Sequence, residues 1–139
     1  MRYAKTESQI FVSLEPGEAV QGSLVALATE LGLGAAWVQG IGVIDRLELG
    51  FYQRETRDYK TQRFDGDFEV LTLVGNLSTK EGAPFLHLHG SFSGPDFLVR
   101  GGHFLGGQVS VSAEFVLQPS SLPIQRKYSP QSNLFLWDL

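Results

Sequence analysis

All three histidines of this chain lie within seventeen positions, at His87, His89 and His103. Side chains two positions apart on a β-strand point to the same face, so His87 and His89 can present both imidazoles together. Three neutral imidazoles are a sufficient protein ligand set for a catalytic-type zinc ion, whose fourth position is left to water or substrate. The histidines therefore predict a site for zinc or another divalent metal, which can polarise a carbonyl group or lower the pKa of bound water to about 7.

The third histidine joins the first two only if a β-hairpin forms. A strand over 85–92 and a return strand over 97–105, joined by the turn signal Ser93-Gly94-Pro95-Asp96, place His103 on the neighbouring strand. The sequence does not fix the register of this hairpin, and Gly101-Gly102 can add a bulge just before His103. A second interpretation stays open, in which the histidines occupy the wet face of a strand and bind nothing.

Carboxylates could complete such a site from outside the histidine segment. Glu69, Asp96 and Glu114 are candidates for a fourth ligand or for hydrogen bonds to a ligating imidazole, and no spacing rule selects among them. The glycine-rich stretch 100–107 lacks the Gly-Lys-Ser/Thr end of a P-loop, and no Ser–His–acid arrangement can be read from the sequence. The sequence thus identifies no catalytic residue, and it leaves open whether the protein is an enzyme.

One helix is predicted, near the N-terminus. Pro16 suits its first turn, because the missing N–H of proline has no intrahelical partner there. Gly32 or Gly34 can end the helix in a left-handed conformation, which gives a length of about four turns. Apolar residues follow one another at helical spacing along this segment. They are Val20, Leu24, Leu27 and Leu31.

The remainder of the chain alternates as β-structure, with strands predicted over 9–14 and 109–117 as well as in the hairpin. Another predicted strand places four residues on one face and Glu69, Leu71 and Leu73 on the other. The four are Phe68, Val70, Thr72 and Val74.

The last part of the chain is predicted to be less regular. Residues 119–130 are predicted to form a loop, and the apolar segment 134–137 to dock on the body of the protein or on a neighbouring subunit. One helix packed on a largely antiparallel sheet, an α+β fold, is the simplest architecture for these elements.

Composition limits the classes to which the protein can belong. At 139 residues, with 42% hydrophobic and 19% charged residues, residues 1–139 are expected to form a single globular domain. No cysteine is present, so disulfides and thiolate metal sites are excluded. No signal peptide or membrane-spanning run is found, and we expect a cytoplasmic protein with no membrane partner.

The charge of the chain does not support nucleic-acid binding. The formal net charge is −4, whereas a protein that holds DNA by its phosphates normally has a basic face. Glu55 and Asp58 interrupt the densest basic stretch, which we interpret as a solvated surface. The basic residues of that stretch are Arg54, Arg57, Lys60 and Arg63.

Five segments, taken in their order and spacing, resemble the plants and prokaryotes conserved (PPC) domain, the domain that accompanies AT-hooks in plant nuclear proteins. The resemblance covers nearly the whole chain. The segments are Glu30-Leu31-Gly32-Leu33, Val38-Gln39-Gly40-Ile41-Gly42, the stretch 66–76, His87-Leu88-His89-Gly90-Ser91 and Gly101-Gly102-His103-Phe104.

This resemblance implies a mixed, largely antiparallel sheet with one main helix packed on it, assembled as a homotrimer. It also implies that His87, His89 and His103 together are the zinc-type ligand set of prokaryotic members. Two departures matter. Asp67 stands where plant relatives have an arginine linked to partner-protein contact, so that role is not transferred. The chain also has no AT-hook, the short Arg-Gly-Arg segment that enters the DNA minor groove.

Three functions follow from these patterns. The first is a stand-alone prokaryotic PPC-domain protein whose three-histidine metal site acts on or senses a small molecule. The second is a DNA-binding or DNA-associated regulatory protein without an AT-hook. The third is an oligomerisation module with an idle histidine face.

Overall fold

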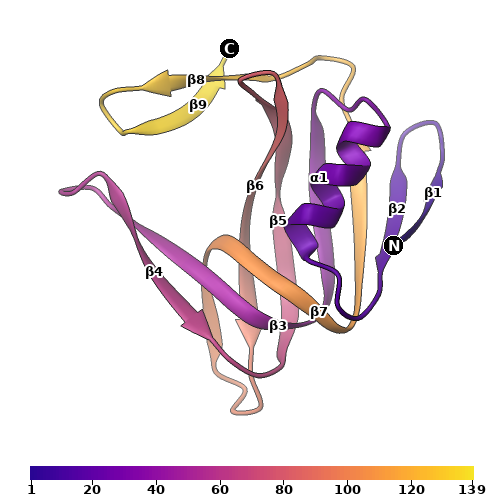
Figure 1. Ribbon diagram of the computed structural model, residues 1–139, viewed down its shortest axis with the longest axis vertical. Coiled ribbons are helices and arrows are strands. Elements are labelled where there is room, and N and C mark those ends of the chain that lie inside the picture. The colour runs from indigo at the N-terminus through magenta and orange to yellow at the C-terminus, as the bar shows by residue number, and fades with distance from the viewer.

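The computed structural model describes residues 1–139 as one helix and nine β-strands joined in a single sheet (Figure 1). Every strand pair is antiparallel except β5 with β8, which are parallel. This confirms the predicted α+β class with a mixed, largely antiparallel sheet. The elements are β1 (Arg2–Lys5), β2 (Ile10–Leu14), α1 (Val20–Glu30), β3 (Ala36–Gln53), β4 (Asp58–Phe64), β5 (Phe68–Lys80), β6 (Ala83–Ser93), β7 (Val99–Pro119), β8 (Gln125–Ser129) and β9 (Leu134–Asp138).

Four of the strands close into a ring. β3 pairs with β5, β5 with β6, β6 with β7, and β7 returns to β3. β3 and β7 are 18 and 21 residues long, and register shifts along their ladder allow them to bend around the ring. In Figure 1 the helix lies in front of the strands beside β1 and β2, while the β3–β4 hairpin extends away to the left. No helix has the length and hydropathy of a membrane span.

The helix begins later than predicted. Gly17 donates its backbone N–H to the Val109 carbonyl, and Val109 donates to the Glu18 carbonyl, so residues 17 and 18 pair with β7 rather than forming a first turn. The prediction that Pro16 opens the helix is therefore wrong, and the helix has 11 residues, about three turns. Its predicted end is correct, since Gly32 adopts a φ of 63° just beyond it.

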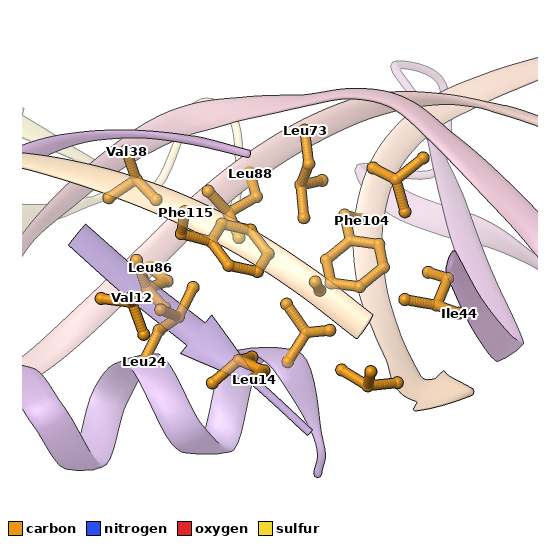
Figure 2. Close-up of a cluster of buried hydrophobic side chains, with 14 of the residues drawn as sticks. Val12, Leu14, Leu24, Val38, Ile44, Leu73, Leu86, Leu88, Phe104 and Phe115 are labelled. Atoms are coloured by element: carbon orange, nitrogen blue, oxygen red, sulfur yellow. The ribbon is translucent and has the colours of Figure 1, made fainter. Parts of the chain in front are cut away.

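The inside of the ring and the helix stripe form one continuous core (Figure 2). Phe92 of β6 and Phe104 of β7 stack with their ring centroids 5.8 Å apart, and both are fully buried. Burying a side chain of this size stabilises the fold by about 1.5–3 kcal/mol. The predicted core face of the histidine strand is confirmed, because Leu86, Leu88 and Phe92 are all buried.

Two strand predictions need correction in detail. Residues 99–105 and 109–117 of the two predicted strands are parts of one strand, β7, because the chain stays extended through Gly106 and Gly107. On β5 the predicted alternation holds from Phe68 to the exposed Leu71 and then reverses, so that Thr72 is exposed and Leu73 is buried. A register shift between Val70 and Thr72 in the β5–β6 ladder accounts for the reversal, because an extra residue moves the following side chains to the opposite face.

β8 and β9 form a C-terminal arm, the name used below for residues 125–138. The prediction of a loop over 119–130 is wrong for 125–129, which pair with β9 and, at two positions, with the end of β5. The apolar segment 134–137 is β9, and its docking on the body of the protein is confirmed, since the Trp137 indole donates to Asn76 of β5. In Figure 1 the arm lies above the tip of the β3–β4 hairpin, with the C-terminus beside it.

Candidate metal centre

The three histidines come from two neighbouring strands of the ring. His87 and His89 alternate along β6 with the buried Leu86 and Leu88, which turn toward the core. In the β6–β7 ladder His89 lies directly opposite His103. The register that the sequence left open thus brings the third imidazole to the first two, and the predicted hairpin is confirmed.

The ring nitrogens of the histidines converge. Nε2 of His87 lies 3.2 Å from Nε2 of His89, and Nδ1 of His103 lies 3.4 Å from the same His89 atom. Each histidine offers one such atom, and the three atoms all lie within 4.8 Å of one another. Two nitrogens bound to a tetrahedral zinc ion at its usual bond lengths are about 3.3 Å apart. The spacing around His89 therefore fits a metal ion without rearrangement of the strands.

The surroundings of His87 and His103 keep these two rings neutral, as metal binding requires. Burial, the Arg126 guanidinium and His89 lower the pKa of His87 below its ordinary value. Burial and the other two imidazoles lower the pKa of His103 to about 4. At neutral pH both rings are unprotonated and carry a free lone pair.

Close approach of two backbones fixes the position of His87. A Cβ atom at Gly75 on β5 would overlap the carbonyl oxygen of His87 on β6. Gly75 pairs with Leu88 in the β5–β6 ladder, so only glycine allows the two strands to approach this closely. The placement of the first histidine therefore depends on a glycine of the neighbouring strand.

Arg126 of the C-terminal arm lies beside His87. Its Nη2 is 3.5 Å from His87 Nδ1, which is too long to fix the tautomer of that ring. The guanidinium donates hydrogen bonds to Ser78 Oγ (2.7 Å), to the Phe135 carbonyl (2.8 Å) and to Asn76 Oδ1 (2.9 Å). These bonds tie β8 and β9 to β5 next to the histidines.

Tyr59 of β4 covers the other side of the cluster. Its ring lies 4.8 Å from the ring of His103, inclined by 33°, and Tyr52 contacts Tyr59 edge-on at 5.5 Å. Burial, with a smaller contribution from Tyr52, raises the pKa of Tyr59. The Tyr59 hydroxyl therefore remains a protonated hydrogen-bond donor at neutral pH.

A cleft of about 380 Å³ opens beside the histidines, between β4 and the C-terminal arm. Its lining combines imidazoles, two cations and an apolar wall. The lining residues are Tyr59, Lys80, Phe85, His87, His103, Arg126, Tyr128, Asn133, Leu134, Phe135 and Leu136.

The tips of two hairpins meet over this cleft. Tyr52 donates its hydroxyl to the Ser132 carbonyl at 2.6 Å. Arg57 donates to the Pro130 carbonyl, and its own carbonyl accepts from Asn133, both at 3.3 Å. The arm is thus attached at its base to β5 and at its tip to the β3–β4 hairpin.

The three predicted carboxylates lie elsewhere. Glu69 and Glu114 line a separate pocket over β3, β5 and β7. Asp96, in the turn between β6 and β7, forms an ion pair with Arg100 at 2.6 Å, and hydrogen bonds from that guanidinium lower its pKa to about 2. The structure brings the three predicted histidines together and places no carboxylate among them.

Sequence reasoning missed Asn76, Arg126 and Tyr59. Asn76 pairs with His87 across the β5–β6 ladder, and counting back from the turn at 81–82 could have found it. Arg126 and Tyr59 carry no such signal, because they reach the cluster through the parallel β5–β8 contact and the β3–β4 hairpin.

Comparison with known proteins gives one family and several solved structures. The Plants and Prokaryotes Conserved (PCC) domain matches residues 1–121. No curated protein matches the chain significantly. A Bacteroides thetaiotaomicron protein, described provisionally as DNA-binding, is 30% identical with a TM-score of 0.95, over 99% of this chain and 96% of its own.

Two archaeal structures are also similar. A plant- and prokaryote-conserved (PPC) protein from Pyrococcus horikoshii is 28% identical with a TM-score of 0.88, over 99% of this chain and 94% of its own. A metal-containing protein from Archaeoglobus fulgidus is 30% identical with a TM-score of 0.87, over the full length of both chains. The likeness to these structures includes the C-terminal arm, which lies beyond the matched family segment.

Proposed function

Since the chain belongs to the Plants and Prokaryotes Conserved (PCC) domain family, we propose that it binds a divalent metal ion and acts on or senses a small molecule at that ion. His87, His89 and His103 would hold the metal, with zinc the best match to three imidazole ligands. The adjoining cleft would receive the small molecule.

The observation that carries this proposal is the convergence of the ring nitrogens at spacings of 3.2 and 3.4 Å. Three protein ligands leave a tetrahedral ion one open position, as in catalytic rather than structural sites. The metal-containing relative from Archaeoglobus fulgidus supports the same assignment. When bound, the metal would polarise a carbonyl group or lower the pKa of a water molecule.

The protein's own groups would bind and orient the small molecule. Tyr59, whose ring lies against His103, lines the cleft and carries a hydroxyl donor, and Phe85 and Phe135 provide apolar surface. Such a cleft is typical of small-molecule sites, which are largely apolar with a few placed polar groups.

Elemental analysis of protein purified without added metal tests the proposal. We expect close to one divalent ion per chain, and His89→Ala should weaken its binding by about a hundredfold or more, since even outer partners of metal ligands contribute 10–100-fold. Phe135→Ala, which changes the cleft wall but no ligand, is the matched control and should keep the metal. A wild-type protein without metal would refute the proposal.

The oligomeric state of the same variants separates a functional metal from a structural one. We propose a homotrimer, supported by exposed Ile41, Leu71 and Val111 on the central strands, since exposed apolar patches mark association sites. Light scattering after size-exclusion chromatography should give three chains for wild type and for His87→Ala. Loss of the assembly together with the metal would mean that the metal is structural.

DNA association is the second candidate, and the Bacteroides thetaiotaomicron relative favours it. The net charge of −4 does not. Fluorescence anisotropy with a labelled duplex at several salt concentrations decides between them. An affinity that falls steeply with salt would support DNA binding, because phosphate contacts release counterions.

A further inference from the structure

Two cations stand side by side at the edge of the cleft. Lys80 and Arg126 are direct partners in the parallel β5–β8 ladder. Both side chains lie against the ring of Phe85, with Lys80 Nζ 5.6 Å and Arg126 Cζ 4.9 Å from its centroid. Like charges placed directly opposite each other in a sheet are destabilising. A negatively charged partner would therefore stabilise the pair.

No acidic group of the protein supplies that compensation. The ion pairs of the structure involve Arg2, Arg63, Arg100 and the N-terminus, and neither Lys80 nor Arg126 takes part in one. The lining of the cleft contains no aspartate or glutamate. Burial lowers the pKa of Arg126, as expected for a desolvated cation without a counter-charge.

Arg126 also keeps a donor free for a ligand. A guanidinium has five N–H groups; three serve the bonds to Ser78, Asn76 and the Phe135 carbonyl, and a fourth faces His87 Nδ1 at 3.5 Å. Lys80 Nζ has no hydrogen-bond partner and rests 4.0 Å from the centroid of the Phe135 ring. Fixed hydrogen bonds hold the guanidinium in place, so it can receive an anion without further ordering.

Much of the rest of the cleft is apolar. Phe85, Leu134, Phe135 and Leu136 contribute hydrophobic surface, while His87, which lies beside Arg126, and His103 also line the cleft. A purely inorganic anion would leave that apolar surface unused. An anion that carries a short hydrocarbon body would cover it.

We propose that Lys80 and Arg126 form an anion-binding pair, and that the cleft takes a small organic acid with its anionic headgroup on these cations and its apolar body against Phe85 and Phe135. The inference deepens the proposed function, because it names the class of molecule that would reach the metal. Binding of the anion by Lys80 and Arg126 does not depend on the metal. Only the statement that the bound molecule reaches the metal rests on the proposed function.

Nuclear magnetic resonance of the ¹⁵N-labelled full-length protein tests the pair directly. The Arg126 Nε–H, bonded to Ser78, and the Trp137 indole N–H, bonded to Asn76, are natural reporters beside the site. We expect saturable shifts of both signals with hexanoate or hexyl phosphate and none with hexanamide. The stronger of the two acids identifies the headgroup. Equal shifts with hexanamide, or tighter binding of inorganic phosphate alone, would overturn the proposal.

Substitution of Lys80 tests the charge of the pair without removing the hydrogen bonds by which Arg126 holds the arm. Lys80→Gln should weaken hexanoate binding on the order of tenfold, since hydrogen bonds to charged groups are the stronger ones, and Lys80→Arg should restore it. Lys127→Gln is the matched control, because Lys127 is the next residue of β8 after Arg126 and is exposed outside the cleft. An equal loss of hexanoate binding in Lys127→Gln would show that the effect comes from the overall charge of the protein, and it would refute the proposed anion-binding pair.

The same titrations before and after removal of metal by a chelator distinguish the two proposals. Hexanoate binding to a protein that never holds metal would uphold the anion pair and refute the metal site. Full metal content without hexanoate binding would do the reverse.

Discussion

The histidine hairpin and the C-terminal arm face the same cleft but are held by different means. β6, which carries two of the candidate metal ligands, has an antiparallel partner on each side, β5 and β7. The arm joins the sheet at only two residue pairs, with Thr79 and Lys80 of β5. Its other attachments are the hydrogen bonds of Arg126, the bond from the Trp137 indole to Asn76 and those at the hairpin tips.

This difference separates two tasks within one site. The geometry of the three histidines is set by continuous ladders and a filled core, where a small shift would disturb many contacts. The cover of the cleft depends on a few side-chain bonds, which open at low free-energy cost. We therefore expect a rigid metal centre beside a wall that can yield to a ligand.

The largest effect is expected in the core beneath the hairpin. Phe104→Ala removes a buried ring stacked on Phe92 and should lower the free energy of unfolding by about 3–5 kcal/mol. Urea denaturation measures it. Phe97→Ala is the matched control, because Phe97 is 87% exposed, and it should change the free energy by no more than about 0.5 kcal/mol. Similar losses in both variants would show that the hairpin is not anchored through its core.

The second-largest effect is expected at His103 of the histidine hairpin, when the pH is lowered. In the metal-free protein the pKa of His103 is lowered from 6.5 to about 4, so between these pH values the unfolded chain binds more protons than the folded one. The neutral His103 ring therefore contributes stability that is fully present above pH 6.5, decreases as the pH falls, and is lost as the pH falls through about 4.

Two measurements follow this titration in the metal-free protein. Proton resonances of His103 should titrate near pH 4, and urea denaturation should show stability falling over the same interval. His103→Gln should flatten that fall. A His103 midpoint near its ordinary value of 6.5 would mean that the ring is more solvated than the structure indicates.

The smallest effect is expected at the tip of the arm. Tyr52→Phe deletes the 2.6 Å bond to the Ser132 carbonyl, a loss of about 1 kcal/mol. Amide hydrogen exchange in β8 and β9 should quicken by about fivefold, with β6 and β7 unchanged. Tyr3→Phe, which deletes an exposed bond to Glu30 on another part of the molecule, is the control. Uniform acceleration through all strands would show that the arm and the ring open as one unit.

The same division decides what the sequence could predict. Local patterns identified the stripe of the helix, the core face of β6 and the pairing of the histidine strands, since each depends on periodicity or on a short turn. The start of the helix could not be predicted, because the hydrogen bonds of residues 17 and 18 to Val109 override the preference of Pro16. The reversal on β5 arises from a bulge that no composition signal marks.

The arm escaped prediction because its partners are distant in sequence. Residues 125–129 show no clear apolar alternation, and they become a strand only through β9 and the end of β5. Arg126 consequently appeared as one basic residue of a loop. The three histidines proposed to bind the metal could be named in advance, whereas the residues proposed to bind the small organic acid could not.

The contact between Gly75 and His87 has a practical consequence for protein engineering. A combinatorial library built on this scaffold should keep the Gly75 codon fixed, because any side chain there would push the strand bearing His87 out of place. Leu134, Phe135 and Leu136 line the cleft with their side chains and could be varied instead. Selection on such a library could reprogram which compound is accepted while the imidazole trio stays intact.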